Sequence, residues 1–337
     1  MIDLSAQLSI GGVVLRNRVF LAPMSGITDA VFRRLADGHG AGLVVSEMVA
    51  SGELAKGRGD TTRRIRRPDI GVHMVQLAGR EATHMAEAAR IVADSGADIV
   101  DINMGCPAKK VTGGYCGSAL MRDPDHALRL IDAVVGAVSV PVTLKMRLGW
   151  DENALNAPLI ARRAEEAGIR MITVHGRTRC QFYRGSADWR AIARVTQAVS
   201  VPVVANGDIH SLAEARQALD MSGADAVMVG RAHYGAPWMA GAIALEAAGQ
   251  TVAVAPQEPA ELAEYAVAHY DAMLGLYGTE TGLRVARKHI GWYFDRHVDP
   301  GAVELRRTAL TSSEPATVVA ALRTAICGAS GPARRAA

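Results

Sequence analysis

The sequence predicts an α/β fold, a (β/α)8 TIM barrel followed by a C-terminal helical bundle domain. Short β-prone runs recur eight times, stretches with helical periodicity separate them, and this alternation stops near residue 240. Alternating strands and helices favour a parallel sheet of βαβ units. Eight units within about 230 residues are more typical of a closed barrel than of an open sheet.

The structural alternative is an open, doubly wound sheet. Such a sheet usually carries a G-x-G-x-x-G turn after its first strand. The corresponding position in this chain reads APMSGITD, over residues 22–29. The absence of that glycine pattern favours the barrel.

The expected strands are short runs dominated by apolar residues, separated by helical stretches such as 81–97 and 125–138. In chain order they span 19–24, 42–48, 73–78, 98–105, 142–149, 171–178, 203–209 and 226–232. We expect a barrel domain over residues 1–245, a helical domain over 246–330 and a disordered tail over 331–337.

Composition excludes several classes of protein. The hydrophobic fraction of 49% suffices for a large core, and no apolar run is long enough to span a membrane. The N-terminus lacks the pattern of a signal peptide, so we expect a cytoplasmic protein. The four cysteines form no C-x-x-C pair, and neither a disulfide framework nor a metal site is expected. We also expect a monomer. The net charge of +3 is not informative by itself.

Polar residues interrupt the expected strands close to their carboxyl ends, although strands buried on both faces should be almost wholly apolar. They are Glu47, Gln76, Asp101, Asn103, Lys145, Arg147, His175, Arg177, Asn206, Asp208 and Arg231. Residues two apart share one face of a strand, so several of these form pairs that point together. Because barrel enzymes carry their active sites at this end, the pattern predicts one shared site.

The last two expected strands suggest a phosphate site. Gly207 and Gly230 would let the backbone approach a ligand closely, and Arg231 could add a charged donor. Loops after the seventh and eighth strands often hold phosphate in this fold. With Lys145 and Gln76 across the mouth, the site would suit a mononucleotide cofactor, but composition does not distinguish FMN from a phosphorylated sugar.

A cysteine follows the fourth expected strand. Gly105 and Pro107 bracket Cys106, which could be a nucleophile, a proton donor or an inert buried residue. The glycine-rich segment 112–118 is expected to form a lid, and it contains Cys116. From these residues either thiol could act. Cys180 and Cys327 are expected to serve packing alone.

The motifs APMSGITD, SEM, QLAG, DINMGCPAKKV, LKMRLGW, HGRTR, ANGDI and VGRA, in this order, resemble those of bacterial tRNA-dihydrouridine synthases. The B subfamily is the most similar, and the likeness runs from about residue 10 to about residue 310. The ordered set is specific, whereas a single element such as ANGDI recurs in other FMN barrels.

The resemblance implies that NADPH or NADH reduces FMN, which then delivers a hydride from N5 to C6 of a D-loop uridine in tRNA. It assigns to Cys106 the proton that reaches C5, so Cys116 would not be the family's acid. A thiol of ordinary pKa is mostly protonated at neutral pH and can donate. The barrel would be the catalytic, FMN-binding domain.

The resemblance also implies roles for residues at the barrel mouth. It places Pro23, Met24 and Ser25 along the flavin, Gln76 and Lys145 at the isoalloxazine edge, and His175 near the flavin and its phosphate. The ribityl-phosphate site would comprise Asn206, Gly207, Asp208, Gly230 and Arg231. Asn103 and Arg177 would line the substrate pocket.

A basic segment near the C-terminus, residues 283–297, has helical spacing. Leu283, Ala286, Ile290 and Tyr293 follow an apolar stripe, and Arg284, Arg287 and Lys288 fall on an adjacent face. Arg296, Arg306 and Arg307 add charge to the region. A solvated helix face is the simpler interpretation; with the resemblance, contact with tRNA phosphates is expected, and the helical domain would recognise tRNA.

Two rival hypotheses remain. A dehydrogenase of the dihydroorotate type would explain the flavin site but not the basic helical domain. A non-catalytic RNA-binding protein would use the barrel only as a scaffold.

Overall fold

The computed structural model describes residues 2–57, 59–250 and 254–328, and the expected tail at 331–337 lies outside these ranges. The chain divides into two compact units. The first comprises Met1–Ala232 and Met239–Thr251, and the second comprises His233–Trp238 and Val252–Ala337. The six residues 233–238 therefore belong with the C-terminal helices, although the sequence suggested a single boundary near residue 245.

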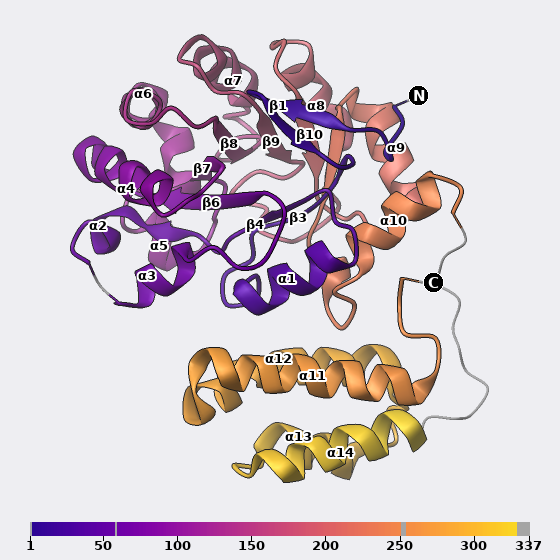
Figure 1. The fold of residues 1–337 in the computed structure, drawn as a ribbon. Helices are drawn as coiled ribbons and strands as arrows, with labels where there is room; N and C mark the ends of the chain where they lie inside the picture. Colours follow the sequence, from indigo (N-terminus) through magenta and orange to yellow (C-terminus); the bar gives the residue numbers. More distant parts are fainter. Residues whose placement is uncertain (1, 58, 251–253, 329–337) are drawn as a thin grey trace. The chain divides into compact units, whose positions relative to one another are not determined.

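Within the described residues, eight parallel strands close into a barrel, because β4 pairs with both β3 and β6. Figure 1 shows this barrel with its surrounding helices. The strands are β3 (Val19–Leu21), β4 (Leu43–Val45), β6 (His73–Ala78), β7 (Ile99–Met104), β8 (Val142–Arg147), β9 (Ile172–His175), β10 (Val203–Asn206) and β11 (Ala226–Val229). A short β5 (Val49–Ala50) adds to β6. The predicted TIM barrel is confirmed.

The helices of the first unit follow the strands in the expected alternation. They are α1 (Ala30–Gly38), α2 (Ser51–Leu54), α3 (Gly59–Ile65), α4 (Ala82–Asp94), α5 (Lys109–Thr112), α6 (Pro124–Val135), α7 (Ala157–Glu166), α8 (Trp189–Thr196), α9 (Leu212–Ser222) and α10 (Met239–Ala247), with the 3-10 turn η1 (Gly117–Arg122). A second 3-10 turn, η2 (Arg231–His233), begins in the first unit and ends at the first residue of the second. Asp29, Asp123, Asp188 and Ser211 cap four of the helices by accepting a backbone N–H three residues ahead.

An N-terminal hairpin that the sequence did not reveal packs against the amino ends of the strands. Its strands, β1 (Leu8–Ile10) and β2 (Val13–Leu15), pair antiparallel. Leu8, Ile10 and Leu15 join one apolar cluster with residues such as Phe20 and Met74 near the strand starts. The hairpin thereby covers the end of the barrel opposite the polar strand ends.

Most observed strands are shorter than the predicted runs. Only the run 73–78 matches its strand, β6, at both ends, whereas the run 19–24 ends at Leu21 as β3. Pro23 has no N–H with which to continue a ladder. The residues beyond the strand ends form loops, and these loops hold much of the candidate site.

The second unit contains the helical bundle that the sequence predicts. Its helices are α11 (Pro259–Tyr277), α12 (Thr279–His297), α13 (Val303–Thr311) and α14 (Pro315–Gly328). The segment 233–238 belongs to this bundle because Tyr234 stacks on Trp292, with ring centroids 3.8 Å apart. His297 also bonds through Nε2 to the carbonyl of Gly235, at 2.7 Å.

Membrane spans and metal clusters are both absent from the described residues. None of their helices combines the length and apolarity needed to cross a membrane. Nor do they contain a group of three or more His, Cys, Asp or Glu side chains that could hold a metal ion.

Candidate active site

Hydrogen bonds hold the backbone on both sides of Cys106, which lies two residues beyond β7. Its amide donates to Oδ1 of Asn103 at 3.0 Å, and its carbonyl accepts from the amide and hydroxyl of Ser118, at 3.1 and 2.9 Å. The preceding carbonyl, of Gly105, accepts from Nε of Arg147 at 2.8 Å. The half-buried thiol is therefore carried by a fixed loop at the barrel mouth.

The glycine-rich segment lies directly against this loop. Gly117 has a φ of +60°, and a Cβ there would lie 2.8 Å from the carbonyl oxygen of Cys106. In this segment the thiol of Cys116 donates to the carbonyl of Gly114 at 3.3 Å, and burial raises the pKa of Cys116. The two thiols thus differ in setting, and the choice of Cys106 as the acid stays a prediction.

A chain of buried side chains runs across three strands to the Cys106 loop. Asp101 accepts from Oγ1 of Thr143 at 2.6 Å and from Nε2 of Gln76 at 2.7 Å. Oε1 of Gln76 accepts from Nδ2 of Asn103 at 2.7 Å. Burial raises the pKa of Asp101 to about 6, although these hydrogen bonds and the charge of Lys145 oppose the shift.

Lys145 lies on the neighbouring strand and projects into the same site. Its Nζ donates to Oδ1 of Asn206 at 3.0 Å, and Nδ2 of Asn206 donates to the carbonyl of Met228 at 2.7 Å. Burial, with a smaller contribution from the charge of Arg147, lowers the pKa of Lys145 to about 8. An ionised Cys106 would act in the opposite direction, so the thiol lies within electrostatic reach of this ammonium group.

Arg147 anchors the loop that follows β9. The sequence marked this residue as a polar strand end but gave it no role. Its guanidinium is buried and donates through Nη1 to the carbonyls of Thr178 and Phe182, at 2.9 and 2.8 Å. It also lies 5.5 Å from the ring centroid of Tyr183. Arg147 thus ties this loop to the Cys106 loop.

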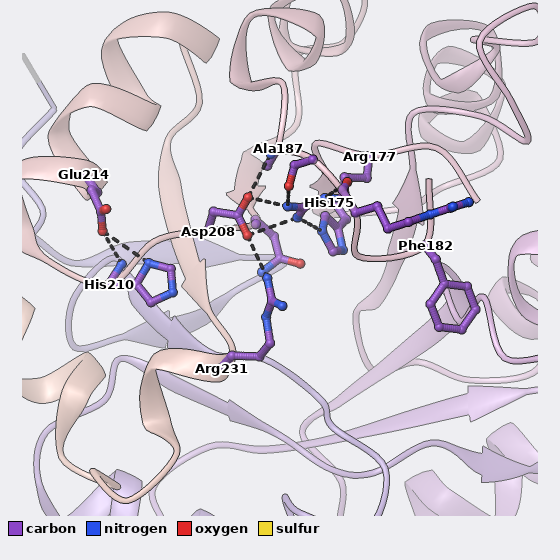
Figure 2. Close-up of polar contacts among 12 residues, drawn as sticks. His175, Arg177, Phe182, Ala187, Asp208, His210, Glu214 and Arg231 are labelled. Atoms are coloured by element: carbon purple, nitrogen blue, oxygen red, sulfur yellow. Dashed lines mark hydrogen bonds and ion pairs between the residues drawn. The ribbon is translucent and has the colours of Figure 1, made fainter. Parts of the chain in front are cut away.

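Asp208 is the centre of the predicted phosphate region, as Figure 2 shows. It accepts from Arg177 at 2.5 Å, from Arg231 at 2.8 Å and from the amide of Ala187 at 2.8 Å. Burial would raise the pKa of Asp208, but the bonds from Arg177 and Ala187 and the charges of both arginines hold it below its usual value. Asp208 thereby fixes Arg231, whose side chain is 44% exposed.

Arg177 was expected to line the substrate pocket. In the structure it is 1% exposed and donates to Asp208 and to the carbonyls of Arg184 and Gly185, at 3.1 and 2.6 Å. The guanidinium therefore supports the loops around Asp208. Its contact with substrate remains a prediction.

His175 lies beside this cluster, behind Gly207. Burial and then the charges of the surrounding cations lower the pKa of His175 well below its usual value, so the ring is neutral at pH 7. Gly207 has a φ of +118°, and a Cβ there would lie 3.0 Å from the imidazole. The glycine is required for both its backbone conformation and this close approach.

The segment Pro23–Met24–Ser25 follows β3 and reaches the Gly230 turn. A Cβ added to Gly230 would meet only Ala22 and Met24, at 3.9 and 4.0 Å. Pro23 and Met24 are half-buried and Ser25 is exposed. Met24, one of the three residues predicted to lie along the flavin, therefore lies beside the Gly230 turn.

The donors at this end of the barrel fit a flavin mononucleotide. An amide (Gln76), an ammonium group (Lys145) and an exposed guanidinium (Arg231) match the acceptor-rich edge of an isoalloxazine and a phosphate. A Cβ at Gly230 would make only ordinary van der Waals contacts, so packing within the chain does not require a glycine there. The predicted cofactor residues thus form a chemically consistent set.

The sequence pattern did not reveal a pocket between two loops of the barrel unit. A pocket of about 490 Å³ lies between the loops after β8 and β9, with Asp151, Thr178, Gln181 and Arg184 among its lining residues. Cys180 also lines this pocket, and both Cys180 and Cys327 are exposed. That these two cysteines have no chemical role stays a prediction.

The second unit presents the predicted basic face. Arg284, Arg287 and Lys288 on α12 are exposed, while Ala286, Ile290 and Tyr293 are buried as the apolar stripe predicts. Arg306 instead pairs with Asp295 at 2.7 Å, and Arg307 pairs with Glu304 at 2.5 Å. Arg306 and Arg307 are thus engaged in ion pairs, while Arg284, Arg287 and Lys288 present exposed side chains on α12.

Comparisons with known proteins agree with this geometry. Among solved structures, morphinone reductase aligns with a TM-score of 0.54 and 15% identity, covering 77% of this chain and 93% of that chain. A morphinone reductase variant in complex with tetrahydroNAD aligns with a TM-score of 0.55, also at 15% identity, covering 77% and 94%. At such low identity these likenesses show the fold alone.

Sequence relatives carry more information. The chain is 56% identical over 308 residues to a probable tRNA-dihydrouridine synthase of Rhizobium leguminosarum bv. phaseoli, covering 91% of this chain and 95% of the relative. It is 45% identical over 321 residues to tRNA-dihydrouridine synthase B of Xanthomonas axonopodis pv. citri, covering 94% and 95%. A family model described as dihydrouridine synthase matches residues 20–329. The chain belongs to the dihydrouridine synthase family.

Proposed function

We propose that this chain is a tRNA-dihydrouridine synthase that uses FMN and NADPH, or NADH, to saturate the C5–C6 bond of a D-loop uridine. The observation that carries the proposal is the Cys106 loop, which is fixed at its amide by Asn103 and at its carbonyl by Ser118. The loop stands at the same barrel end as the donors that fit a flavin. Family membership supports the reaction class.

In this proposal Gln76 and Lys145 hold the edge of the isoalloxazine, and Arg231 with the Gly207 and Gly230 turns holds the phosphate. His175 and Asn206 lie between the isoalloxazine site and the phosphate site, and Pro23, Met24 and Ser25 border this region. When bound, FMN supplies a hydride to C6 of the uracil after reduction by the nicotinamide cofactor. Because the pKa of Lys145 is about 8, the side chain is mostly charged at pH 7 and can donate to an acceptor oxygen.

Cys106 supplies the proton. Addition of a hydride at C6 builds negative charge at C5 and O4 of the uracil. The thiol of Cys106 gives its proton to C5, so the product gains one hydride and one proton, and water then reprotonates the thiolate. Lys145 and Arg147 lie within electrostatic reach of Cys106, so two cations border the place where the proton is transferred.

The substrate is a base within folded RNA. It must leave its stack to reach the barrel mouth, which costs a few kcal/mol. Contacts between Arg284, Arg287 and Lys288 and the phosphates would offset part of that cost. Asn103 and Arg177 complete the proposed substrate contacts.

The decisive experiment compares two thiols. Cys106→Ala should keep FMN and tRNA binding and lose most dihydrouridine formation, by about 100-fold or more, because the positioned acid is gone. Cys116→Ala is the matched control and should retain the rate. Dihydrouridine in tRNA is measured by mass spectrometry after incubation with NADPH.

Three outcomes would reject parts of the proposal. Normal turnover by Cys106→Ala, with a dead Cys116→Ala, would reassign the acid. Reduction of free pyrimidines as fast as tRNA would favour a dihydroorotate-type enzyme. If purified protein reconstituted with FMN keeps its yellow colour when NADPH is added, a non-catalytic RNA-binding role would be favoured.

A further inference from the structure

Asp101 is a carboxylate buried in the barrel interior. The residue is 2% exposed, and its carboxylate accepts hydrogen bonds from the neutral side chains of Thr143 and Gln76. The three residues lie side by side on neighbouring strands. Asp101 on β7 is in register with Gln76 on β6 and with Thr143 on β8. A buried carboxylate costs free energy that an apolar side chain would not. Its raised pKa has the same cause.

The hydrogen bonds from Asp101 to Cys106 form one polar chain with a single direction. An ionised carboxylate can only accept, so Nε2 of Gln76 must face Asp101 and Oε1 must face Asn103. Nδ2 of Asn103 then faces Gln76, which leaves Oδ1 for the amides of Gly105 and Cys106, at 3.2 and 3.0 Å. Turning either amide over would place two donors or two acceptors against each other.

Thr143 does not impose this direction. A hydroxyl can donate or accept, so it adapts to whatever Asp101 presents. Both ends of the chain impose this direction, because the carboxylate of Asp101 can only accept and the amides of Gly105 and Cys106 can only donate. Asp101 fixes it at the end that lies three hydrogen bonds away from the backbone of Cys106.

We propose that Asp101 is a positioning residue for the proposed reduction, because it orients Gln76 and Asn103 and so fixes the loop that carries Cys106. This inference rests on the proposed function in treating Cys106 as the proton donor. Asp101 touches neither substrate nor thiol in this role, and it acts through two side chains that face the site.

Exchanging the two polar residues of β7 tests the relay. Asn103→Asp alone sets a carboxylate oxygen against Oε1 of Gln76, and Gln76 cannot turn over while Asp101 is a carboxylate. In the double variant Asp101→Asn with Asn103→Asp, Gln76 can turn over, and every donor again meets an acceptor. Both variants carry the Asn103→Asp substitution, so a direct effect of the introduced carboxylate on substrate is the same in the two. Recovery in the double variant is the result expected if Gln76 turns over.

Two readouts are measured. The first is single-turnover reduction of tRNA uridine, separated from tRNA affinity. The second is the rate at which iodoacetamide alkylates the Cys106 peptide, followed by mass spectrometry with exposed Cys180 as the internal reference. We expect Asn103→Asp to slow turnover on the order of 100-fold, since small misplacement of a reacting group has that effect. Alkylation should become faster as the loop loosens. The double variant should reduce tRNA at least tenfold faster than Asn103→Asp does, and its alkylation rate should return to the wild-type value.

A second pair of variants, at Gln76 and Asp101, keeps the relay testable if Asn103→Asp does not fold. Gln76→Glu alone opposes two carboxylates, and Gln76→Glu with Asp101→Asn restores each hydrogen bond. Recovery of alkylation in either double variant supports the relay. No recovery in either one, or a single variant that behaves as wild type, overturns it. If wild-type protein does not reduce tRNA, the proposed function fails, but the alkylation comparison still decides the relay.

Discussion

Asp208 shows how one residue can organise a ligand site through its neighbours. It adopts a φ of +52°, a left-handed conformation that only a few non-glycine residues tolerate, Asp among them. From this position its carboxylate meets a buried guanidinium on one side and an exposed one on the other. The exposed side chain, Arg231, is thereby held where a phosphate could bind it.

Asp208→Asn should destabilise the fold by about 3 kcal/mol, because it leaves the buried Arg177 without its counter-charge. Urea unfolding followed by circular dichroism measures the loss. Asp125→Asn is the control, since its pair with Arg163 is exposed and should contribute less than about 1 kcal/mol. Equal losses of stability in the two variants would show that burial does not strengthen the Asp208–Arg177 ion pair.

At the scale of elements, α11 and α12 meet through buried histidines that the sequence gave no reason to single out. His269 on α11 bonds through Nδ1 to the hydroxyl of Tyr293 on α12, at 3.0 Å. The rings of His269 and His289 pack edge to face, with centroids 4.9 Å apart. Burial lowers the pKa of His269 to about 4 and that of His289 well below its usual value.

The helical unit should therefore lose stability in acid. Its histidines protonate more readily when unfolded, so their contribution is fully present above pH 6.5 and is lost as the pH falls towards 4. Between pH 7 and pH 5, His269 alone accounts for about 2 kcal/mol. His269→Gln should reduce this acid sensitivity in thermal melts, whereas exposed His210→Gln should leave it unchanged. An unaltered pH dependence in His269→Gln would mean that this imidazole is already charged in the folded unit.

At the scale of the whole molecule, α12 is expected to bind phosphates. Arg287→Ala with Lys288→Ala should weaken tRNA binding and reduce the slope of log affinity against log salt by about 1.5 to 2, because each phosphate contact releases counterions. Filter binding at several salt concentrations measures this slope. Arg90→Ala with Arg163→Ala removes the same charge from the barrel helices α4 and α7 and should leave the slope nearly unchanged. A wild-type slope in the α12 variant would remove this face from the RNA footprint.

Much of the architecture could be predicted from periodicity. The alternation of strands and helices predicted the barrel, and the apolar stripe of α12 predicted its buried residues Ala286 and Ile290. The N-terminal hairpin was missed because three-residue strands carry too little pattern to stand out. The place of 233–238 was missed because stacking of Tyr234 on Trp292 joins residues far apart in the chain.

The sequence by itself determined the barrel, the helical bundle and the polar strand ends, because these follow from local spacing of side chains. Its motifs also singled out Cys106 as the acid, a role that the comparison of Cys106→Ala with Cys116→Ala tests. Only the tertiary structure decided which polar groups meet. It set Asp101 between Gln76 and Thr143 and set Arg177 behind Asp208, because register between strands and the closure of the barrel determine these neighbours.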